Sequence, residues 1–157
     1  MQKITTFLWF DDQAEAAATF YTSLFPNSRI TQVTRYPETG PGGAGSVMTV
    51  AFELAGREYA ALNGGPEFHF TEAMSLQVEC DGQQEVDELW AKLTADGGQA
   101  GPCGWLKDRF GLSWQITPRV LLDLIADEDR AKAGRVMAMM MRMQKIEVQP
   151  LLDAARG

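Results

Sequence analysis

The feature that most constrains the fold of this chain is an internal repeat of one apolar stripe. Four apolar residues in the first half follow i, i+3, i+4, i+7 spacing, the pattern of a helix that buries one face. The same spacing returns 69 positions later, which predicts two equivalent helices and therefore a duplicated unit. The paired residues are Ala17 and Val86, Phe20 and Leu89, Tyr21 and Trp90, and Leu24 and Leu93.

A strand pattern precedes each predicted helix. Ile4–Phe10 and Met74–Glu79 are rich in the residues that favour strands, and each ends at a short polar break. Asp12 and Glu15 have the spacing of a capping box, which predicts that Asp12 caps the first helix. The strands repeat at an offset of 68, because Leu8 corresponds to Leu76 and Phe10 to Val78.

Further strand signals follow each helix, three in the first half and two in the second, so each half is predicted to be a β-α unit followed by two or three strands. The fold class is therefore α+β, with modules at about 1–63 and 72–118 and a helical tail at 119–157. One helix per module cannot cover both faces of a sheet, which leaves one face for solvent, a ligand or the other half. The additional strands are predicted at Arg29–Tyr36, Val47–Leu54, Glu58–Asn63, Gln99–Leu106 and Leu112–Thr117.

Two other segments have patterns of their own. Glu38–Gly45 is rich in glycine and proline but is followed by a strand, so it predicts a hairpin connection rather than a phosphate-binding loop. The tail is predicted to form helices at Asp127–Met143 and Pro150–Ala155. The first of these is rich in methionine, which suits core packing, a lid over a pocket or contact with a second subunit.

Charge and composition exclude several classes of partner. The chain carries 14 Lys and Arg against 21 Asp and Glu, a net charge of −7 that disfavours nucleic acid and anionic membranes. It has no apolar run near the roughly 20 residues of a bilayer span, and Met1–Phe10 lacks the features of an export signal. We therefore expect a cytoplasmic protein in which Cys80 and Cys103 are reduced.

Four stretches of the sequence resemble a known family. They are FLWFDDQAEAAATFYTSLFPNS, LNGGPEFHFTEAMSLQVECDGQQEVDELW, CGWLKDRFGLSWQITP and RAKAGRVMAMMMRMQKI. Together with the duplicated module, they are similar to the PhnB-like branch of the vicinal oxygen chelate (VOC) superfamily. This branch is labelled the 3-demethylubiquinone-9 3-methyltransferase domain, and the superfamily includes glyoxalases, bleomycin-resistance proteins and dioxygenases. The resemblance implies that paired βαβββ modules form a cup, usually completed in a homodimer.

In the members of this superfamily that use a metal, four strands contribute His or Glu ligands to a divalent ion in the cup. The positions that correspond to three of these ligands are Thr5, Ala73 and Gln115, and the fourth lies within Glu58–Asn63 and is not assigned. Hydroxyl, methyl and carboxamide groups are poor ligands for such an ion. No cofactor is therefore expected.

Strand alternation assigns residues to the face that would line the cup. If Gln115 occupies the position of a superfamily metal ligand, its side chain faces the cup. Trp114, the adjacent residue, then faces the helices, and residues two positions from Gln115 along the strand also face the cup. A cup with aromatic walls and neutral hydrogen-bonding groups suits a small aromatic or oxygenated molecule. Alternatively, Trp9 and Trp105 fill a dimer interface and Gln115 satisfies backbone groups. The expected ligand-binding residues are Phe7, Trp9, Ser75, Gln77, Trp105, Ser113 and Gln115.

Three hypotheses for the function follow. The first is a metal-free protein that binds a small molecule; the second is an enzyme of the demethylubiquinone methyltransferase type; the third is a metal-dependent lyase, isomerase or dioxygenase. Glu79 is the one weak catalytic candidate, because alternation places its carboxylate on the cup side. Asp108 is expected to shape a turn, and His69 to lie at the surface. No glycine-rich turn that would bind S-adenosylmethionine is recognised.

Overall fold

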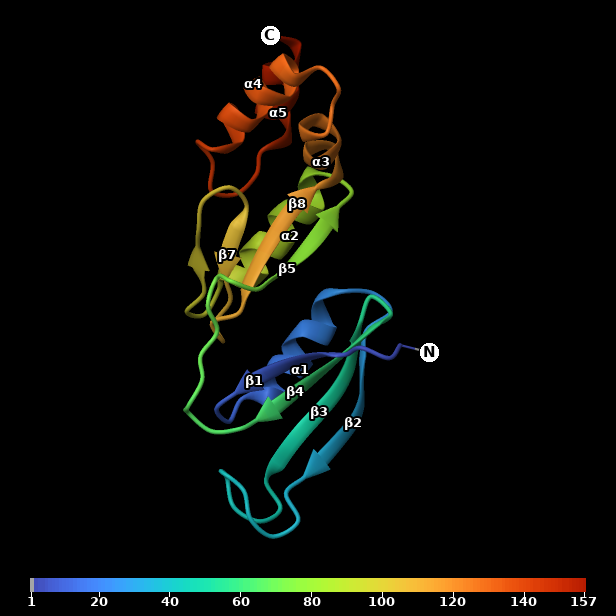
Figure 1. Ribbon diagram of the computed structural model, residues 1–157, viewed down its shortest axis with the longest axis vertical. Coiled ribbons are helices and arrows are strands. Elements are labelled where there is room, and N and C mark those ends of the chain that lie inside the picture. The colour runs from blue at the N-terminus through green and yellow to red at the C-terminus, as the bar shows by residue number, and fades with distance from the viewer. Residues whose placement is uncertain (1) are drawn as a thin grey trace. The chain divides into compact units, whose positions relative to one another are not determined.

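The computed structural model describes residues 2–157 and divides into two compact units, Met1–Phe70 and Thr71–Gly157. Each unit contains one four-stranded mixed sheet and one helix that follows the first strand of that sheet (Figure 1). The described part of the chain thus has the predicted fold class, paired βαβββ modules followed by C-terminal helices. Among residues 2–157, no helix is both long and apolar enough to cross a bilayer.

The first unit has strand order β1-β4-β3-β2, in which β1 and β4 are parallel and the other neighbours antiparallel. Helix α1 packs against β3 and buries Ala17 and Tyr21 completely. Leu8 and Phe10 on β1 are buried, whereas the alternate residue Phe7 is exposed, as the strand period requires. The elements are β1 (Thr6–Phe10), α1 (Ala14–Leu24), β2 (Arg29–Arg35), β3 (Val47–Leu54) and β4 (Arg57–Asn63).

The predicted capping box of α1 is wrong. Gln13 occupies the N-cap position and makes no capping hydrogen bond through its side chain, while Asp12 and Glu15 are exposed. Instead, the Oδ1 atom of Asn63, at the end of β4, accepts a hydrogen bond of 2.8 Å from the Ala14 backbone nitrogen. A distant strand therefore supplies the acceptor that sequence spacing had assigned to a local residue.

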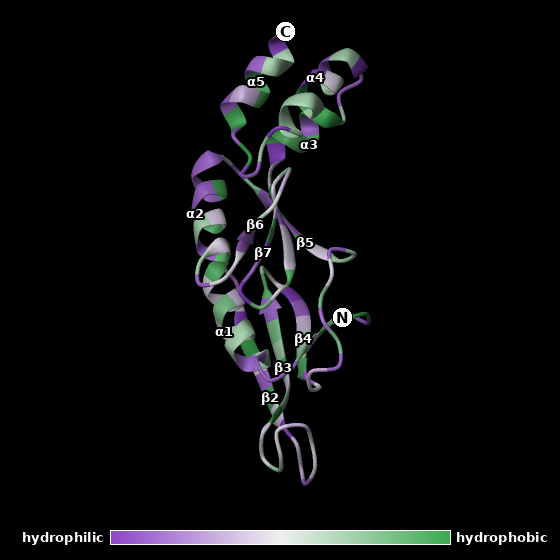
Figure 2. Ribbon diagram, turned by 90° about the vertical axis from the view of Figure 1, so that its left-hand side faces the viewer, coloured by the Kyte–Doolittle hydropathy of each residue, from purple (hydrophilic) through white to green (hydrophobic). Residues whose placement is uncertain are grey.

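The second unit repeats this arrangement with strand order β5-β8-β7-β6, again with its first and last strands parallel. Helix α2 buries Val86, Leu89 and Leu93, as its stripe predicts, and it carries polar residues on its other face (Figure 2). The elements are β5 (Ser75–Cys80), α2 (Gln83–Thr94), β6 (Gln99–Ala100), β7 (Trp105–Lys107) and β8 (Ser113–Pro118).

The segment predicted as one strand, Gln99–Leu106, is instead a hairpin of two short strands. Pro102 lacks a backbone N–H, and Cys103 and Gly104 have φ angles of 58° and 83°, which turn the chain back so that Gln99 pairs with Lys107. Trp114, predicted to face the helices, is buried. Its neighbours Ser113 and Thr117 on the opposite face are buried as well, so burial alone does not separate the two faces of β8.

Three helices complete the second unit. They are α3 (Arg119–Ile125), α4 (Arg130–Met140) and α5 (Val148–Arg156), so the long helix predicted at Asp127–Met143 is shorter than expected. Asp129 begins α4 by accepting a hydrogen bond from the Lys132 backbone nitrogen. The helices enclose a small core of their own, in which Met139, Met140 and Met143 pack against the buried residues Leu121, Val136, Ile146 and Leu151.

Candidate functional site

The face of the second sheet opposite α2 carries a row of neutral polar side chains. Strands β5 and β8 are parallel neighbours, and Gln77 lies beside Gln115 in their register. The carboxamide nitrogen of Gln115 donates a hydrogen bond of 2.9 Å to the hydroxyl oxygen of Ser75. Because Gln115 pairs with another side chain on this face, it is held in one orientation while its carboxamide oxygen can still accept.

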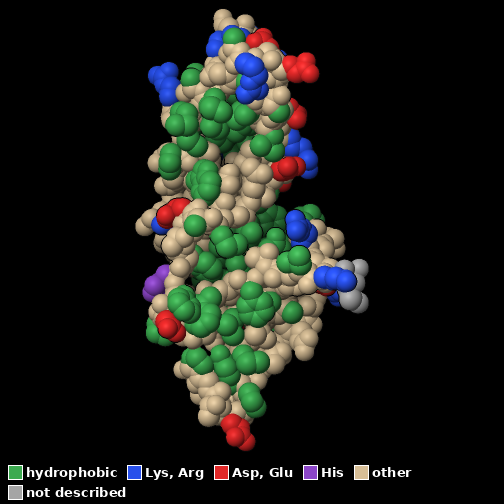
Figure 3. Space-filling model, in the orientation of Figure 1, with side chains coloured by type: hydrophobic (Ala, Val, Ile, Leu, Met, Phe, Trp, Pro, Cys, Tyr) green, Lys and Arg blue, Asp and Glu red, His purple; other side chains and the backbone are tan. Residues whose placement is uncertain are grey.

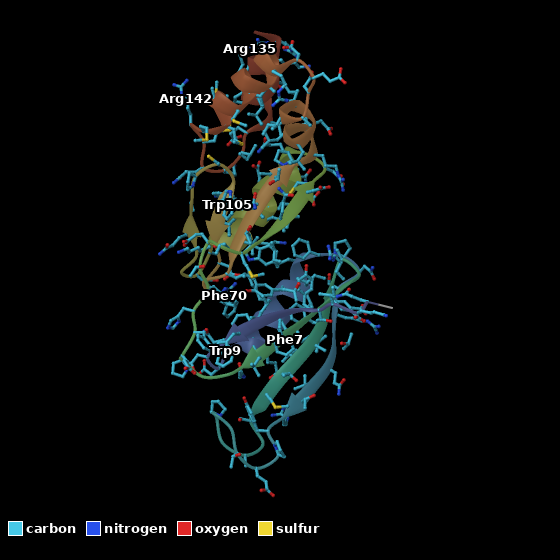
Figure 4. All side chains as sticks on the ribbon, viewed as in Figure 1. Phe7, Trp9, Phe70, Trp105, Arg135 and Arg142 are labelled. Carbon is cyan, nitrogen blue, oxygen red and sulfur yellow. The ribbon has the colours of Figure 1, made fainter. Side chains whose placement is uncertain are left out.

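A hollow lies at the β7 side of this row. Trp105 pairs with Gln115 and Lys107 pairs with Ser113 across β7 and β8, so these side chains belong to one face of the sheet. Figure 4 shows Trp105 on β7. The hollow has a volume of about 190 Å³ and is lined by Glu72, Gln99, Ala100, Gly101, Pro102, Trp105, Leu106, Lys107 and Ser113.

Ser113 has the most unusual environment in this hollow. The residue is only 1% exposed, and its hydroxyl oxygen has no hydrogen-bond partner among residues 2–157. Leaving a buried hydroxyl without a partner costs about 1–3 kcal/mol, so buried polar groups are nearly always paired. The hollow therefore contains one neutral hydrogen-bonding group whose capacity the folded chain does not use.

Lys107 and Glu72 form an ion pair on the wall of the hollow. Both side chains are substantially exposed, so the pair adds little to stability. The hydrogen bond from Lys107 holds the pKa of Glu72 below its usual range, and Glu72 therefore remains ionised at neutral pH. The two charges cancel, which leaves the hollow without a net formal charge.

The turn between β7 and β8 is organised by Asp108, as predicted. One carboxylate oxygen accepts hydrogen bonds from the backbone nitrogens of Phe110, at 2.8 Å, and Leu112, at 3.1 Å. The other accepts a hydrogen bond of 2.9 Å from the indole nitrogen of Trp114. Asp108 is buried, and it fixes the two strands that present Lys107 and Ser113 to the hollow.

The weak catalytic candidate Glu79 lies at the end of β5 on the same face as Gln77. Its carboxylate accepts a hydrogen bond of 2.9 Å from Arg119, which also pairs with Asp81 at 3.1 Å. His69 is exposed in the segment after β4.

In the first unit, Phe7 and Trp9 lie on the face of β1 that α1 does not cover (Figure 4). Phe7 is 58% exposed. Trp9, by contrast, is in contact with other residues of the first unit. The indole nitrogen of Trp9 donates a hydrogen bond of 3.0 Å to the carbonyl of Gly65, and the ring of Phe68 meets it edge-on at a centroid distance of 4.9 Å. Gly64 lies directly against the same indole, where a Cβ atom would collide.

A second hollow, of about 330 Å³, lies in the first unit near the start of α1. It is lined by Asp11, Asp12, Glu15, Pro41, Gly42, Ser46, Val47 and Asn63. Sequence reasoning used Asp12 and Glu15 for a cap and so missed this hollow. The three acidic residues are evident in the sequence. The sequence does not show that folding brings the loop around Pro41, which precedes β3, next to them.

The residues at the positions that correspond to metal ligands in the superfamily do not suit a divalent ion. Thr5 and Ala73 are exposed residues outside the strands, and the amide of Gln115 is bonded to Ser75. Within residues 2–157, no group of three or more His, Cys, Asp or Glu side chains is placed to hold a metal ion. The expectation that the protein uses no cofactor stays a prediction.

Comparison with known proteins agrees with the resemblance seen in the sequence. The model of the 3-demethylubiquinone-9 3-methyltransferase family matches residues 2–117. A PhnB protein from Bacillus cereus, provisionally described as a 3-demethylubiquinone-9 3-methyltransferase, is 42% identical with a TM-score of 0.66. The match covers 74% of this chain and 99% of that one.

More distant structures are also similar. Protein PA1353 from Pseudomonas aeruginosa is 17% identical with a TM-score of 0.63, and the match covers 75% of this chain and 98% of that protein. The fosfomycin resistance protein FosX from Listeria monocytogenes is 16% identical with a TM-score of 0.48, over 73% of this chain and 89% of that one. None of the curated proteins compared with this chain matches it.

Proposed function

Because the chain belongs to the 3-demethylubiquinone-9 3-methyltransferase family, with a PhnB-like VOC fold, we propose that it binds a small aromatic or oxygenated molecule without a metal ion. The site that we propose is the hollow of the second unit, together with the polar row beside it. Binding through an aromatic wall and a few neutral polar groups is typical of small-molecule sites. No catalytic role is assigned to any residue.

The observation that supports this proposal is that Trp105, which lines the hollow, is the cross-strand neighbour of Gln115 in the polar row. The indole of Trp105 offers a large apolar surface to a flat molecule. Gln115, held by Ser75, offers a neutral amide that can donate to or accept from an oxygen-bearing substituent. These two groups match a ring that carries an oxygen.

Tryptophan fluorescence tests the proposal. Titration with a flat phenol should quench the emission, and Trp105→Phe should remove most of the response. Trp9→Phe is the matched control, because Trp9 is already covered by Gly64 and Phe68 and should contribute little. A response that survives in Trp105→Phe but disappears in Trp9→Phe would refute the proposed location.

Methyl transfer is a second candidate because the family description names it. Both strand-to-helix turns, at Asp11-Asp12 and Asp81-Gly82, differ from the glycine-rich turn that holds an adenosine-bearing cofactor in other folds. Calorimetry with S-adenosylmethionine distinguishes the two functions. Heat at micromolar donor would favour the transferase, and its absence at millimolar donor would favour simple binding.

We also propose that the protein acts as a homodimer. Large apolar side chains are exposed at Ile4, Phe7 and Phe68 of the first unit, and Figure 3 shows hydrophobic side chains gathered over its sheet. Such a surface is typical of an interaction site. Light scattering should give twice the chain mass, and Phe7→Asp should yield monomers. A wild-type protein that is monomeric at high micromolar concentration would contradict this part of the proposal.

A further inference from the structure

The unpartnered hydroxyl of Ser113 indicates what kind of group the bound molecule carries. Ser113 lines the hollow, and its hydroxyl oxygen is buried with no partner in the described part of the chain. Most of the other lining is apolar or exposed: Pro102, Trp105 and Leu106 offer no acceptor from their side chains. The hydroxyl oxygen is almost wholly covered, so a hydrogen-bonding atom that enters the hollow would pair with it through a small shift of the Ser113 side chain.

We propose that the molecule bound in this hollow is uncharged and pairs a hydroxyl, carbonyl or amide group with the Ser113 hydroxyl. This inference rests on the proposed function and adds the charge class of the ligand and the residue that selects it. A serine hydroxyl both donates and accepts, so it matches each of these neutral groups.

The first reason for a neutral ligand is the depth of Ser113. A charged group that reaches a residue 1% exposed must give up most of its hydration. A single hydroxyl does not compensate for that loss, whereas a neutral group loses far less and gains a hydrogen bond. Burial therefore disfavours carboxylates and ammonium groups alike at this position.

The second reason is that both charges of the hollow are already matched. Lys107, which could attract an anion, is paired with Glu72, and any anion beside Lys107 would also lie close to the Glu72 carboxylate. A cation beside Glu72 would meet Lys107 in the same way. The chain's net charge of −7 adds a weak long-range repulsion of anions.

The volume of the hollow indicates how much of a molecule it can hold. A cavity of about 150 Å³ is known to accept benzene in another protein, and this hollow measures about 190 Å³. It therefore fits one ring with a short substituent. Trp105 and Pro102 provide apolar surfaces for that ring, and Ser113 receives the substituent.

Four probes that share one ring test the inference: benzyl alcohol, toluene, benzoate and benzylammonium. Binding is followed by NMR shifts of the Trp105 indole proton, assigned with Trp105→Phe. We expect benzyl alcohol to bind at least tenfold more tightly than each of the others. Equal or tighter binding of benzoate or benzylammonium would overturn the neutral-ligand inference while leaving the proposed site intact. Failure of all four probes to shift the indole would refute the site itself.

Two variants test the role of Ser113. Ser113→Ala should weaken benzyl alcohol about tenfold, to the level of toluene, and leave toluene unchanged. It should not lower the unfolding midpoint of the free protein, because the lost hydroxyl makes no hydrogen bond there. Ser23→Ala is the control: Ser23 lies on α1 of the first unit and does not line the hollow, so the preference for alcohol over toluene should persist. A destabilised Ser113→Ala that keeps its preference for the alcohol would overturn the inference.

Discussion

The two βαβββ units share one strand order but differ in how their open faces are built. In the first unit β3 has 8 residues and β4 has 7, and the face carries Phe7 and Trp9. In the second unit β6 has 2 residues and β7 has 3, and the face carries serines and glutamines. The hollow at Trp105 lies where these strands are short.

This difference shows which parts of a duplicated module tolerate change. The buried helix stripe and the parallel pair of strands occur in both units, because each sheet needs one covered face. Strand length and the chemistry of the open face differ, because neither is required to close that core. The second unit combines a shortened edge with polar side chains, which makes it the better candidate for ligand binding.

The largest expected effect concerns the two hairpin turns. In the second unit, Asp108→Ala would leave the backbone nitrogens of Phe110 and Leu112 and the indole of Trp114 without their acceptor. We expect a loss of about 3–5 kcal/mol in the free energy of unfolding, measured with urea. The first unit closes its hairpin with Ala55 and Gly56 at φ angles of 49° and 82°. Ala55→Gly should be neutral or slightly stabilising there, since glycine adopts positive φ readily. A loss below about 1 kcal/mol in Asp108→Ala would show that Asp108 does not organise its turn.

The next effect is a dependence on alkaline pH that belongs to the second unit, which contains both cysteines. Burial, followed by the nearby Glu85 and Asp81 carboxylates, raises the pKa of Cys80 to about 12. The unfolded thiol ionises near its ordinary value of about 8.5. The stability from Cys80 is therefore fully present below that value and is lost as the pH rises toward 12.

Urea titrations of the wild type and Cys80→Ala at pH 8 to pH 11 measure this contribution. Between pH 9 and pH 11 the wild type should lose about 1.4 kcal/mol per pH unit more than the variant. Parallel pH profiles for the two proteins would show that Cys80 ionises normally in the folded state.

The smallest effect tests whether the first unit covers Trp9 as tightly as its structure indicates. Gly64→Ala would place a methyl group against the indole of Trp9 and displace it. We expect a loss of about 1–3 kcal/mol together with a red shift of the tryptophan emission. Gly82→Ala, at a position with no side chain nearby, is the control in the second unit. Unchanged emission and stability in Gly64→Ala would mean that Trp9 is free to contact a ligand.

Hydrophobic periodicity predicted most of the helices and strands. Predictions from neighbouring residues failed where the interacting residue is distant in the sequence. Both helices, most of their buried stripe and the boundaries of β3 were predicted correctly, since each depends on residues that are close in sequence. Phe20, Leu24 and Trp90 are only partly buried. The cap of α1 was predicted wrongly because its acceptor is Asn63 on β4. The prediction of one strand at Gln99–Leu106 missed the turn at Pro102–Gly104, which separates two short strands.

The candidate site shows the same division. Alternation placed Gln115 opposite the buried Trp114, and the structure joins Gln115 to Ser75 on the open face. Glu72, Lys107 and Gln99 were not identified as lining residues, because the sequence does not show that a short β6 brings them around Ser113.

The sequence by itself determined the duplication, the covered face of each sheet and the identity of the polar residues on strands β5 and β8, because these depend on spacings of two to four residues along the chain. Only the tertiary structure decided that the hydroxyl of Ser113 is buried without a partner, that Lys107 is paired with Glu72 and that Trp9 is covered by its own unit. Burial and pairing are properties of neighbours in space, and those neighbours come from segments that the chain brings together only on folding.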